Sequence, residues 1–368
     1  MRILLAPDSF KESLSATDVA HAMELGINRV DSAIECDLCP IADGGEGTVE
    51  ALVTATGGTF HEDEVAGPLG DPVVAKWGML GDRRTAVIEM AQAAGLHLVA
   101  KDQRDPGKTS THGVGELIGK ALDADAKTII VGIGGSATND GGAGMAQALG
   151  VRFDGIQERI NGDMLGWIRR VDTKHRDKRL DNVTVIVACD VTNPLTGPNG
   201  ASAIYGPQKG ASSQQVAKLD DNLSHLARMV KSVDPDIPGA GAAGGLGYGL
   251  VAFCGGELRR GIEIVLDAVR FRDRVRNADL VLTGEGALDG QSLQGKACLG
   301  IAALAAEQNV PTIALVGKVD TSASRQLSEK LLAYFSICNG PVPLEEAMRN
   351  AAALVEATTF NVVRCVRS

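Results

Sequence analysis

Two aspartates follow apolar runs that are typical of buried strands. Asp43 comes after the run Ile34–Ile41 and precedes a glycine-rich turn, and Asp190 follows the run Val183–Cys189. A carboxylate at the carboxyl end of a strand is well placed to accept a proton or to bind a metal ion. Either aspartate is therefore a candidate general base, and the structural alternative for Asp43 is a cap of the tight turn that follows it.

The stretch Gly132–Gly142 holds a dense group of polar side chains among glycines: Ser136, Thr138, Asn139 and Asp140. From Gly132 the same residues loosely match the dinucleotide-binding fingerprint G-x-G-x-x-A. That fingerprint requires a helix to begin at once, whereas the glycines at the end of the stretch interrupt it. The polar cluster, with Ser136 and Asn139 as its candidate ligands, is better suited to a small polyhydroxylated or phosphorylated molecule.

The stretch Thr283–Ala297 approaches a phosphate-binding loop without completing it. The spacing G-x4-G-K runs from Gly290 to Lys296, but Ala297 stands where Ser or Thr binds magnesium. Glycines allow backbone N–H groups to converge on an anion, and a helix that follows adds a partial positive charge. Candidate residues for the nucleotide are Gly284, Glu285, Gly286, Gln291, Ser292 and Lys296, with Asp289 or Glu285 as the carboxylate for a metal.

Lysines lie at two further expected turns. Asp8-Ser9-Phe10-Lys11 joins an acid, a hydroxyl and a base after the first strand, and Lys209 lies between glycines ahead of a helix. Both arrangements suit an anionic ligand, although a capped turn with a solvated lysine accounts equally for Lys11. Asn193, in the turn after Asp190, is a further candidate for hydrogen bonds to substrate hydroxyls.

Together these residues favour phosphoryl transfer. That reaction needs positioned phosphates, cations and magnesium more than it needs a nucleophilic side chain. The six histidines occur in unrelated contexts, without H-E-x-x-H, and the sequence has no G-x-S-x-G elbow.

Short β-type runs alternate with helical runs, which is typical of an α/β protein with a mostly parallel sheet. The expected strands are 2–6, 34–40, 85–90, 127–133, 183–189, 280–283, 312–316 and 332–338, with antiparallel β structure over 57–80. The expected helices are 17–29, 46–56, 113–122, 141–149, 213–230 and 344–357. We predict two α/β domains: a Rossmann-like parallel sheet built from residues 1–65 and 275–368, and a mixed α/β domain, 66–274, inserted between them.

Composition narrows the possible partners. The 368 residues carry a net charge of −10, which argues against general binding to nucleic acids or anionic membranes. The longest uncharged stretch, Ile237–Gly256, contains eight glycines and is read as a turn and helix start, so no membrane span is expected. The seven scattered cysteines predict reduced thiols and a cytoplasmic protein. The oligomeric state stays open.

At these stretches the sequence closely resembles the type I bacterial glycerate kinases. The runs that carry the resemblance are APDSFKESLSA (6–16), PIADGGEGT (40–48), IGGSATNDGG (133–142), ACDVTNPLTGPNGA (188–201), GPQKGA (206–211), GAAGGLGYGL (241–250) and TGEGALDGQSLQGK (283–296). They span nearly the whole chain in the order of the family. Glu12 stands where the common form of the first motif has glycine.

The resemblance implies that ATP and Mg²⁺ are used to phosphorylate D-glycerate at the 2-hydroxyl, in the breakdown of sugar acids and glyoxylate. It also implies two α/β domains with the site in the cleft between them. The residue roles rest on chemistry: Lys296, Ser292 and nearby glycine amides hold the ATP phosphates, and Asp190 or Asp43 accepts the proton. Ser9, Lys11 and Lys209 hold the glycerate carboxylate and the migrating phosphoryl group, and Asn139 and Asn193 orient the hydroxyls. Asp8 is a further candidate for binding the substrate.

Three alternatives remain at this point. A kinase that forms 3-phosphoglycerate differs only in which of two neighbouring hydroxyls attacks. A dinucleotide-dependent oxidoreductase acting on a small hydroxy acid rests on the loose fingerprint at Gly132. A non-catalytic binding protein for small sugar acids would explain the polar loops but not the stretch that ends in Lys296.

Overall fold

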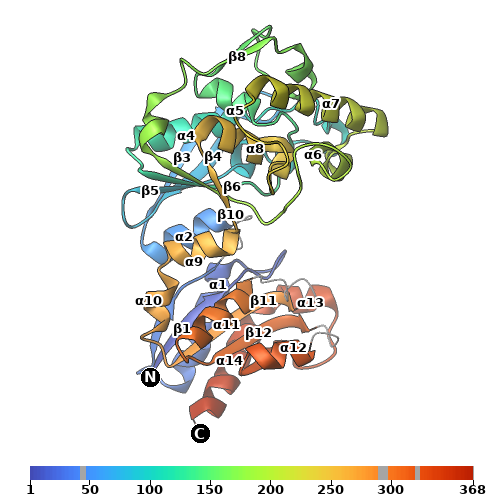
Figure 1. Ribbon diagram of the computed structural model, residues 1–368. Coiled ribbons are helices and arrows are strands. Elements are labelled where there is room, and N and C mark those ends of the chain that lie inside the picture. Colours follow the sequence, from blue (N-terminus) through green and yellow to red (C-terminus); the bar gives the residue numbers. More distant parts are fainter. Residues whose placement is uncertain (42–46, 289–296, 320–323, 368) are drawn as a thin grey trace. The chain divides into compact units, whose positions relative to one another are not determined.

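The chain is a mixed α/β protein, described by a computed structural model over residues 1–41, 47–288, 297–319 and 324–367 (Figure 1). Its internal contacts divide it into two compact units. The first comprises Met1–Asp43, Glu50–Gly57 and Ile262–Ser368, and the second comprises Gly44–Val49 and Gly58–Gly261. These units are defined by contacts alone, so the domain boundaries expected near residues 65 and 274 remain a prediction.

Both ends of the chain build the five-stranded sheet of the first unit. Its strands are β1 (Arg2–Pro7), β2 (Glu35–Leu38), β11 (Leu280–Leu288), β12 (Thr312–Val319) and β13 (Ala333–Ser336). They lie in the order β13-β12-β11-β1-β2, and every neighbouring pair is parallel. Counted along the chain within this unit, the order is 2-1-3-4-5, which differs from the 3-2-1-4-5-6 order of dinucleotide-binding sheets. The order reverses between β1 and β11, and ligands bind at such reversals.

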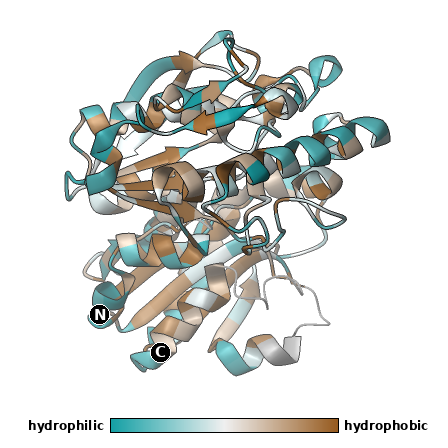
Figure 2. Ribbon diagram, turned by 45° about the horizontal axis from the view of Figure 1, so that its top comes forward, coloured by the Kyte–Doolittle hydropathy of each residue, from teal (hydrophilic) through white to brown (hydrophobic). Residues whose placement is uncertain are grey.

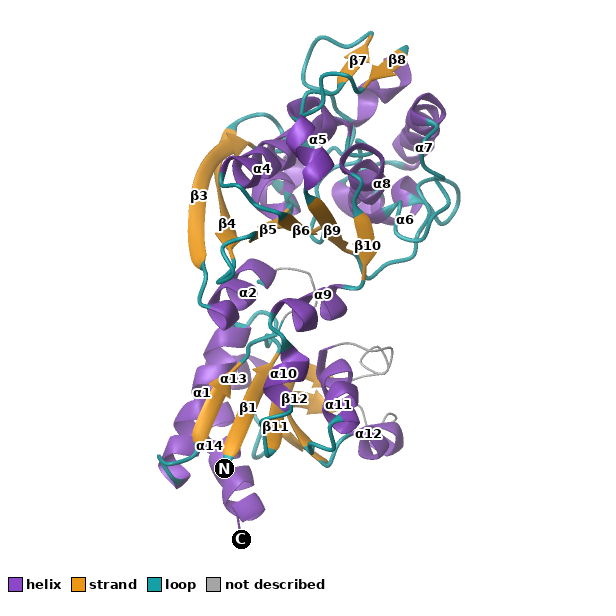
Figure 3. Cartoon of the chain, turned by 60° about the vertical axis from the view of Figure 1, so that its left-hand side comes forward, coloured by secondary structure: helices purple, strands orange, loops and turns teal. Residues whose placement is uncertain are grey.

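Helices cover both faces of this sheet, which explains the unbroken apolar runs of its strands. Ile3, Leu4, Leu5 and Ala6 of β1 are all fully buried. One face packs against α1 (Ala16–Val30) and α14 (Ala351–Arg367), and the other packs against α11 (Ala297–Glu307) and α12 (Ser324–Lys330) (Figure 3). The remaining helices of the unit are α9 (Gly261–Ala268), α10 (Phe271–Val275), α13 (Leu344–Arg349) and most of α2 (Thr48–Thr56).

The second unit has a six-stranded mixed sheet in the order β10-β9-β6-β5-β4-β3. These strands are β3 (Thr59–Ala66), β4 (Pro72–Met79), β5 (Thr85–Glu89), β6 (Thr128–Gly132), β9 (Thr184–Ala188) and β10 (Glu257–Arg259). The antiparallel meander predicted for residues 57–80 is confirmed in β3 and β4. Strands β5, β6, β9 and β10 are parallel, so their carboxyl ends share one edge of the sheet.

Helices and short turns surround this second sheet. The helices are α3 (Ala91–Ala94), α4 (His112–Asp123), α5 (Ala143–Ala148), α6 (Ala201–Tyr205), α7 (Ser213–Val230) and α8 (Ala242–Cys254). The 3₁₀ turns are η1 (Leu96–Leu98), η2 (Lys101–Gln103), η3 (Gly162–Trp167), η4 (Lys178–Asn182) and η5 (Pro207–Lys209), and β7 (Arg152–Asp154) pairs with β8 (Arg170–Asp172). Figure 2 shows apolar strands beneath helices such as α7, whose outer face is hydrophilic.

Two expected elements differ in the structure. The strand predicted to end at Thr283 continues to Leu288, because β12 also extends to Val319 and keeps pairing with it. Gly284, Glu285 and Gly286 are therefore strand residues and do not form a turn. The single helix predicted over residues 344–357 is also wrong: α13 ends at Arg349 and α14 begins at Ala351.

Two glycines on α4 have different surroundings: Gly115 packs tightly against α5, whereas Gly119 faces open space. A Cβ atom on Gly115 would lie 2.3 Å from the carbonyl oxygen of Met145, so only glycine lets α4 approach α5 this closely. One turn further along the same helix, a Cβ atom on Gly119 would meet nothing within 4 Å.

We expect Gly115→Ala to destabilise the second unit by about 1–3 kcal/mol through overpacking. Gly119→Ala, the matched control, should stabilise it by about 0.4–1 kcal/mol because it restricts the unfolded chain. Both tryptophans, Trp77 and Trp167, belong to the second unit, so their fluorescence in a urea titration reports on it. Equal unfolding midpoints for the two variants would contradict this account of the packing.

Candidate functional site

A pocket of about 430 Å³ opens in the first unit at the carboxyl ends of β1 and β11. Its polar lining residues come from the loop Asp8–Ser13 and from Glu285 and Lys318. The backbone N–H of Asp8 donates to the carbonyl oxygen of Gly284 at 2.8 Å, which continues the β1–β11 ladder into this loop. The structure thus brings together Asp8, Ser9, Lys11 and Glu285, which were predicted from separate motifs.

Two carboxylates of this pocket lie near the same buried thiol. Burial raises the pKa of Cys298 well above its ordinary value, and the negative charges of Glu285 and Asp8 raise it further. Asp8 and Glu285 are themselves mostly buried. Asp8 directly follows β1, Glu285 lies in the second half of the neighbouring β11, and both line the pocket. Carboxylates provide the hard oxygen ligands that Mg²⁺ prefers, and substrate phosphates and water would complete its shell.

The backbone conformation of Glu12 explains why the family motif commonly has glycine at this position. Its φ angle is +63°, in the left-handed region that favours glycine. A side chain with a Cβ atom is strained there by about 1 kcal/mol. The departure from the family motif therefore changes the backbone energy of this loop but not its path.

The second unit has its own polar edge, where β5, β6 and β9 end. In the sheet, Glu89 of β5 pairs with Gly132 of β6, and Gly132 pairs with Ala188 of β9. Glu89 therefore ends the strand on one side of β6, and Asp190 follows the strand on the other side. Glu89 is only 5% exposed, and its Oε1 accepts a hydrogen bond from the backbone N–H of Val49 at 2.8 Å. Glu89 is not among the residues predicted from the sequence, although it ends an apolar strand and Asp190 was identified by the same kind of signal.

The loop between β6 and α5 is held from several sides. Gly135, Gly141 and Gly142 all have positive φ angles, and a Cβ atom on Gly244 would lie 1.9 Å from the carbonyl oxygen of Thr138. These glycines allow a backbone path that other residues resist. Because α5 begins only at Ala143, the loop does not follow the dinucleotide fingerprint, as the sequence indicated.

Asp140 anchors this loop from within. It is fully buried and accepts hydrogen bonds from the backbone N–H and the Oγ1 of Thr111, at 2.7 and 2.8 Å, and from the N–H groups of Gly142 and Gly144. Burial raises the pKa of Asp140, and these four donors counteract that effect because they favour the carboxylate.

Lys209 is the second buried charge at the loop. It is 3% exposed, and its Nζ donates to the Oγ of Ser136 at 2.6 Å and to the carbonyl oxygen of Thr138 at 2.7 Å. Burial lowers its pKa to about 7, and the charge of Asp140 acts in the opposite direction. Lys209 and Ser136, both predicted as site residues, are therefore hydrogen-bonded to each other. Two donors of the Lys209 amine are engaged in holding the loop.

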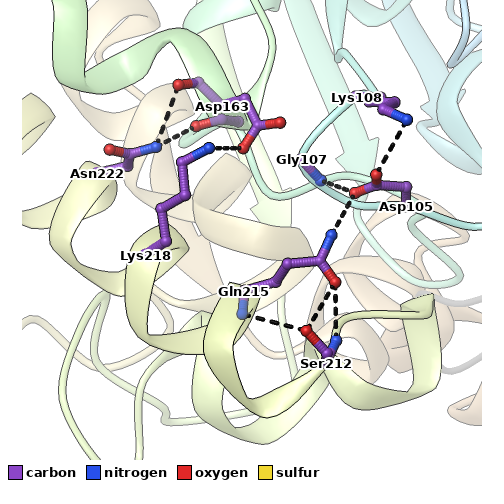
Figure 4. A network of polar contacts seen from close by, with 9 residues as sticks. Asp105, Gly107, Lys108, Asp163, Ser212, Gln215, Lys218 and Asn222 are labelled. Carbon is purple, nitrogen blue, oxygen red and sulfur yellow. Dashed lines mark hydrogen bonds and ion pairs between the residues drawn. The ribbon is translucent and has the colours of Figure 1, made fainter.

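A polar network fixes the start of α7, just after Lys209 (Figure 4). Ser212 and Gln215 form a capping box, and the Nε2 of Gln215 donates to Asp105 at 3.3 Å. Further along α7, Lys218 bonds Asp163 at 2.7 Å. This network ties α7 to two neighbouring loops and so fixes the backbone from which Lys209 extends.

The predicted asparagines and Asp190 have protein partners. Asn139 donates to the Oγ of Ser202 at 2.8 Å, while its buried Oδ1 has no hydrogen-bond partner among the described residues. Asn193 donates to the carbonyl oxygen of Asn199 and accepts from the hydroxyl of Tyr205, so its amide is engaged in its own loop. Asp190 is exposed and accepts a hydrogen bond from the N–H of Gly261 at 3.0 Å.

Several predicted site residues lie outside the described residues: Asp43, Asp289, Gln291, Ser292 and Lys296. Among the residues that the structure does describe, no group of three or more His, Cys, Asp and Glu side chains is arranged to hold a metal ion. In the same part of the chain, no helix is both long and apolar enough to cross a membrane.

The family model described as the glycerate kinase family matches residues 3–367. The chain belongs to this family. It is 50% identical to a glycerate kinase of Bacillus subtilis strain 168, over 100% of this chain and 98% of that protein. It is 48% identical to a glycerate 2-kinase of Escherichia coli strain K12, over 95% and 94% of the two chains.

A solved structure has the same fold. The crystal structure of a candidate glycerate kinase 2 from Salmonella typhimurium LT2 superposes with a TM-score of 0.90 at 48% identity, and the match covers 100% of this chain and 98% of that one. The chain is therefore a kinase, which implies a nucleotide and a small-molecule substrate and typically a divalent metal ion. The match to the glycerate kinase family sets aside the oxidoreductase and the non-catalytic binding protein.

The pKa of Lys209 predicts a pH dependence for the stability of this kinase. In the unfolded chain the amine keeps its proton up to about pH 10.5, whereas in the fold it loses the proton near pH 7. Between these values the unfolded state binds more protons, so the free energy of unfolding rises with pH. Lys209→Met should lower this slope by about 1.4 kcal/mol per pH unit, as expected for one proton.

Urea titrations followed by tryptophan fluorescence between about pH 7.5 and 9.5 measure this slope for the second unit. Lys101→Met is the matched control, because Lys101 lies in the same unit and its side chain is exposed. It should leave the slope unchanged. The same slope in the Lys209→Met variant and the wild type would show that the buried amine keeps its proton.

Proposed function

We propose that the chain transfers the γ-phosphoryl group of ATP, supplied as its magnesium complex, to the 2-hydroxyl of D-glycerate, yielding 2-phosphoglycerate and ADP. The observation that carries the proposal is the match to the glycerate kinase family from residue 3 to residue 367. The name of the Escherichia coli relative favours the 2-hydroxyl. The seven cysteines are all free thiols, which supports a reducing cytoplasmic location.

The first unit provides residues suited to the nucleotide phosphates and the metal ion. Asp8 and Glu285 are the described carboxylates that fit Mg²⁺, which would neutralise charge on the phosphates. Lys11 and Lys318, which line the same pocket, bring positive charge to the phosphoryl group that is transferred. Ser9 is held there by a hydrogen bond from its own N–H to the carboxylate of Asp8 at 2.6 Å.

The second unit provides residues suited to a small polyhydroxylated acid. The buried Oδ1 of Asn139 is an acceptor for a hydroxyl hydrogen, and the Oγ of Ser136 is held in place by Lys209. Because Lys209 uses its donors on the loop, we assign it to positioning Ser136 and Thr138. The amide of Asn193 is engaged likewise, so Asn193 shapes the turn after Asp190.

We assign Asp190 as the general base that accepts the proton of the attacking hydroxyl. As the hydroxyl oxygen bonds to the γ-phosphorus, the bond from that phosphorus to the β,γ-bridging oxygen breaks, and the proton passes to a carboxylate. Asp190 is exposed at the carboxyl end of β9, and the N–H of Gly261 donates a hydrogen bond to one of its oxygens. Asp43, the other candidate, lies outside the described residues.

Incubation of the purified protein with ATP, Mg²⁺ and D-glycerate should yield 2-phosphoglycerate, which ³¹P NMR distinguishes from 3-phosphoglycerate. A signal from 3-phosphoglycerate would keep the kinase and overturn the choice of hydroxyl. Folded protein that forms neither product would refute the proposed activity.

Asp190→Asn should lower kcat by about 10²-fold or more if Asp190 is the base, because the amide cannot accept the proton. Glu257→Gln is a suitable control, since Glu257 is exposed at the opposite, amino end of β10 in the same sheet. It should leave kcat unchanged. A folded Asp190→Asn variant with nearly normal turnover would remove Asp190 from this role.

A further inference from the structure

The pocket of the first unit is amphipathic. Its lining combines the charged residues already described with a group of apolar side chains, the apolar wall: Ile337, Leu344, Ala347, Met348 and Ala351. Leu344 is 74% exposed although it lines the pocket, so apolar surface faces a space open to solvent. The volume of about 430 Å³ lies within the range typical of small-molecule sites.

This apolar wall does not match glycerate. Each carbon of that three-carbon acid carries oxygen, so it buries almost no apolar surface. A purine nucleoside, in contrast, has a flat, weakly polar base at one end and a phosphate chain at the other. Burying the base against the wall would remove apolar surface from water, which is the dominant favourable term in such binding.

The wall is fixed by the break between the last two helices. Here α13 ends at Arg349 and α14 begins at Ala351, and residues from both helices line the pocket. The Oγ of Ser13 donates to the carbonyl oxygen of Met348 at 2.8 Å, which ties α13 to the loop that carries Ser9 and Lys11. The apolar wall and the charged lining residues therefore belong to one preformed site.

We propose that this pocket binds the purine base and ribose of the nucleotide, with the base against α13 and the phosphates toward Lys11 and Lys318. The inference rests on the proposed function, in which ATP is the phosphoryl donor. In this proposal, residues 337–351 determine the specificity for the base. This segment lies outside every sequence motif that was used to predict the site.

Leu344→Ala tests the wall with little risk to the fold, because the side chain is largely exposed. Loss of its contact with the base should raise the KM for ATP and the Kd for ADP, the latter measured by calorimetry, about three- to tenfold. The KM for D-glycerate should not change. Leu332→Ala is the matched control: Leu332 is 64% exposed in the same unit and does not line the pocket, so neither nucleotide constant should change.

Photolabelling locates the base without relying on catalysis. After irradiation of the wild type with 8-azido-ATP, mass spectrometry should find the label within residues 337–351, and excess ATP but not D-glycerate should prevent it. Labelling elsewhere, protection by D-glycerate alone, or an unchanged Kd for ADP in Leu344→Ala would overturn the proposal. If the wild type binds ADP and labels as expected but phosphorylates no glycerate, the subsite stands and the proposed activity fails.

Discussion

The parallel ladder between β1 and β11 is the interaction on which the first unit depends. It pairs Ile3 with Leu280 and Pro7 with Gly284, so residues almost 280 positions apart in the chain become neighbours in the centre of the sheet. The same ladder creates the reversal of strand order and sets Asp8 beside Glu285 at the mouth of the pocket. The core on both faces of the sheet and the pocket at its edge follow from this one pairing.

The second unit buries two ionisable side chains, Asp140 and Lys209, beside the loop between β6 and α5. Asp140 is satisfied by four donors, and Lys209 by a hydroxyl and a carbonyl oxygen. An ionised group that lacked such partners in the interior would be costly, so the two side chains fix the backbone of the loop as much as they serve a ligand. The glycines around them are needed because the loop packs backbone against backbone, as at Gly244 and Thr138.

Much of this arrangement was predictable because it is local. Apolar runs predicted β1, β6 and β9, and the antiparallel pattern of 57–80 was read correctly. The long-range pairing of β11 with β12 was not, so the strand was ended too early and Gly284–Gly286 were assigned to a turn. Glu89 ends an apolar strand much as Asp190 follows one, but its neighbours β6 and Val49 come from elsewhere in the chain, so only the fold shows that its carboxylate is buried and hydrogen-bonded.

The sequence by itself determined the chemistry of this protein: the family, the α/β class, the acidic and basic residues at strand ends, and the glycines that let loops turn around them. Those properties depend on residue type and short spacing, which the chain carries without folding. Only the tertiary structure decided that Lys209 is spent on its own loop, that Asp8 and Glu285 share a pocket, and that α13 supplies the apolar wall. Each of these depends on contacts between distant segments, and on burial that exists only after the sheet and its helices have packed.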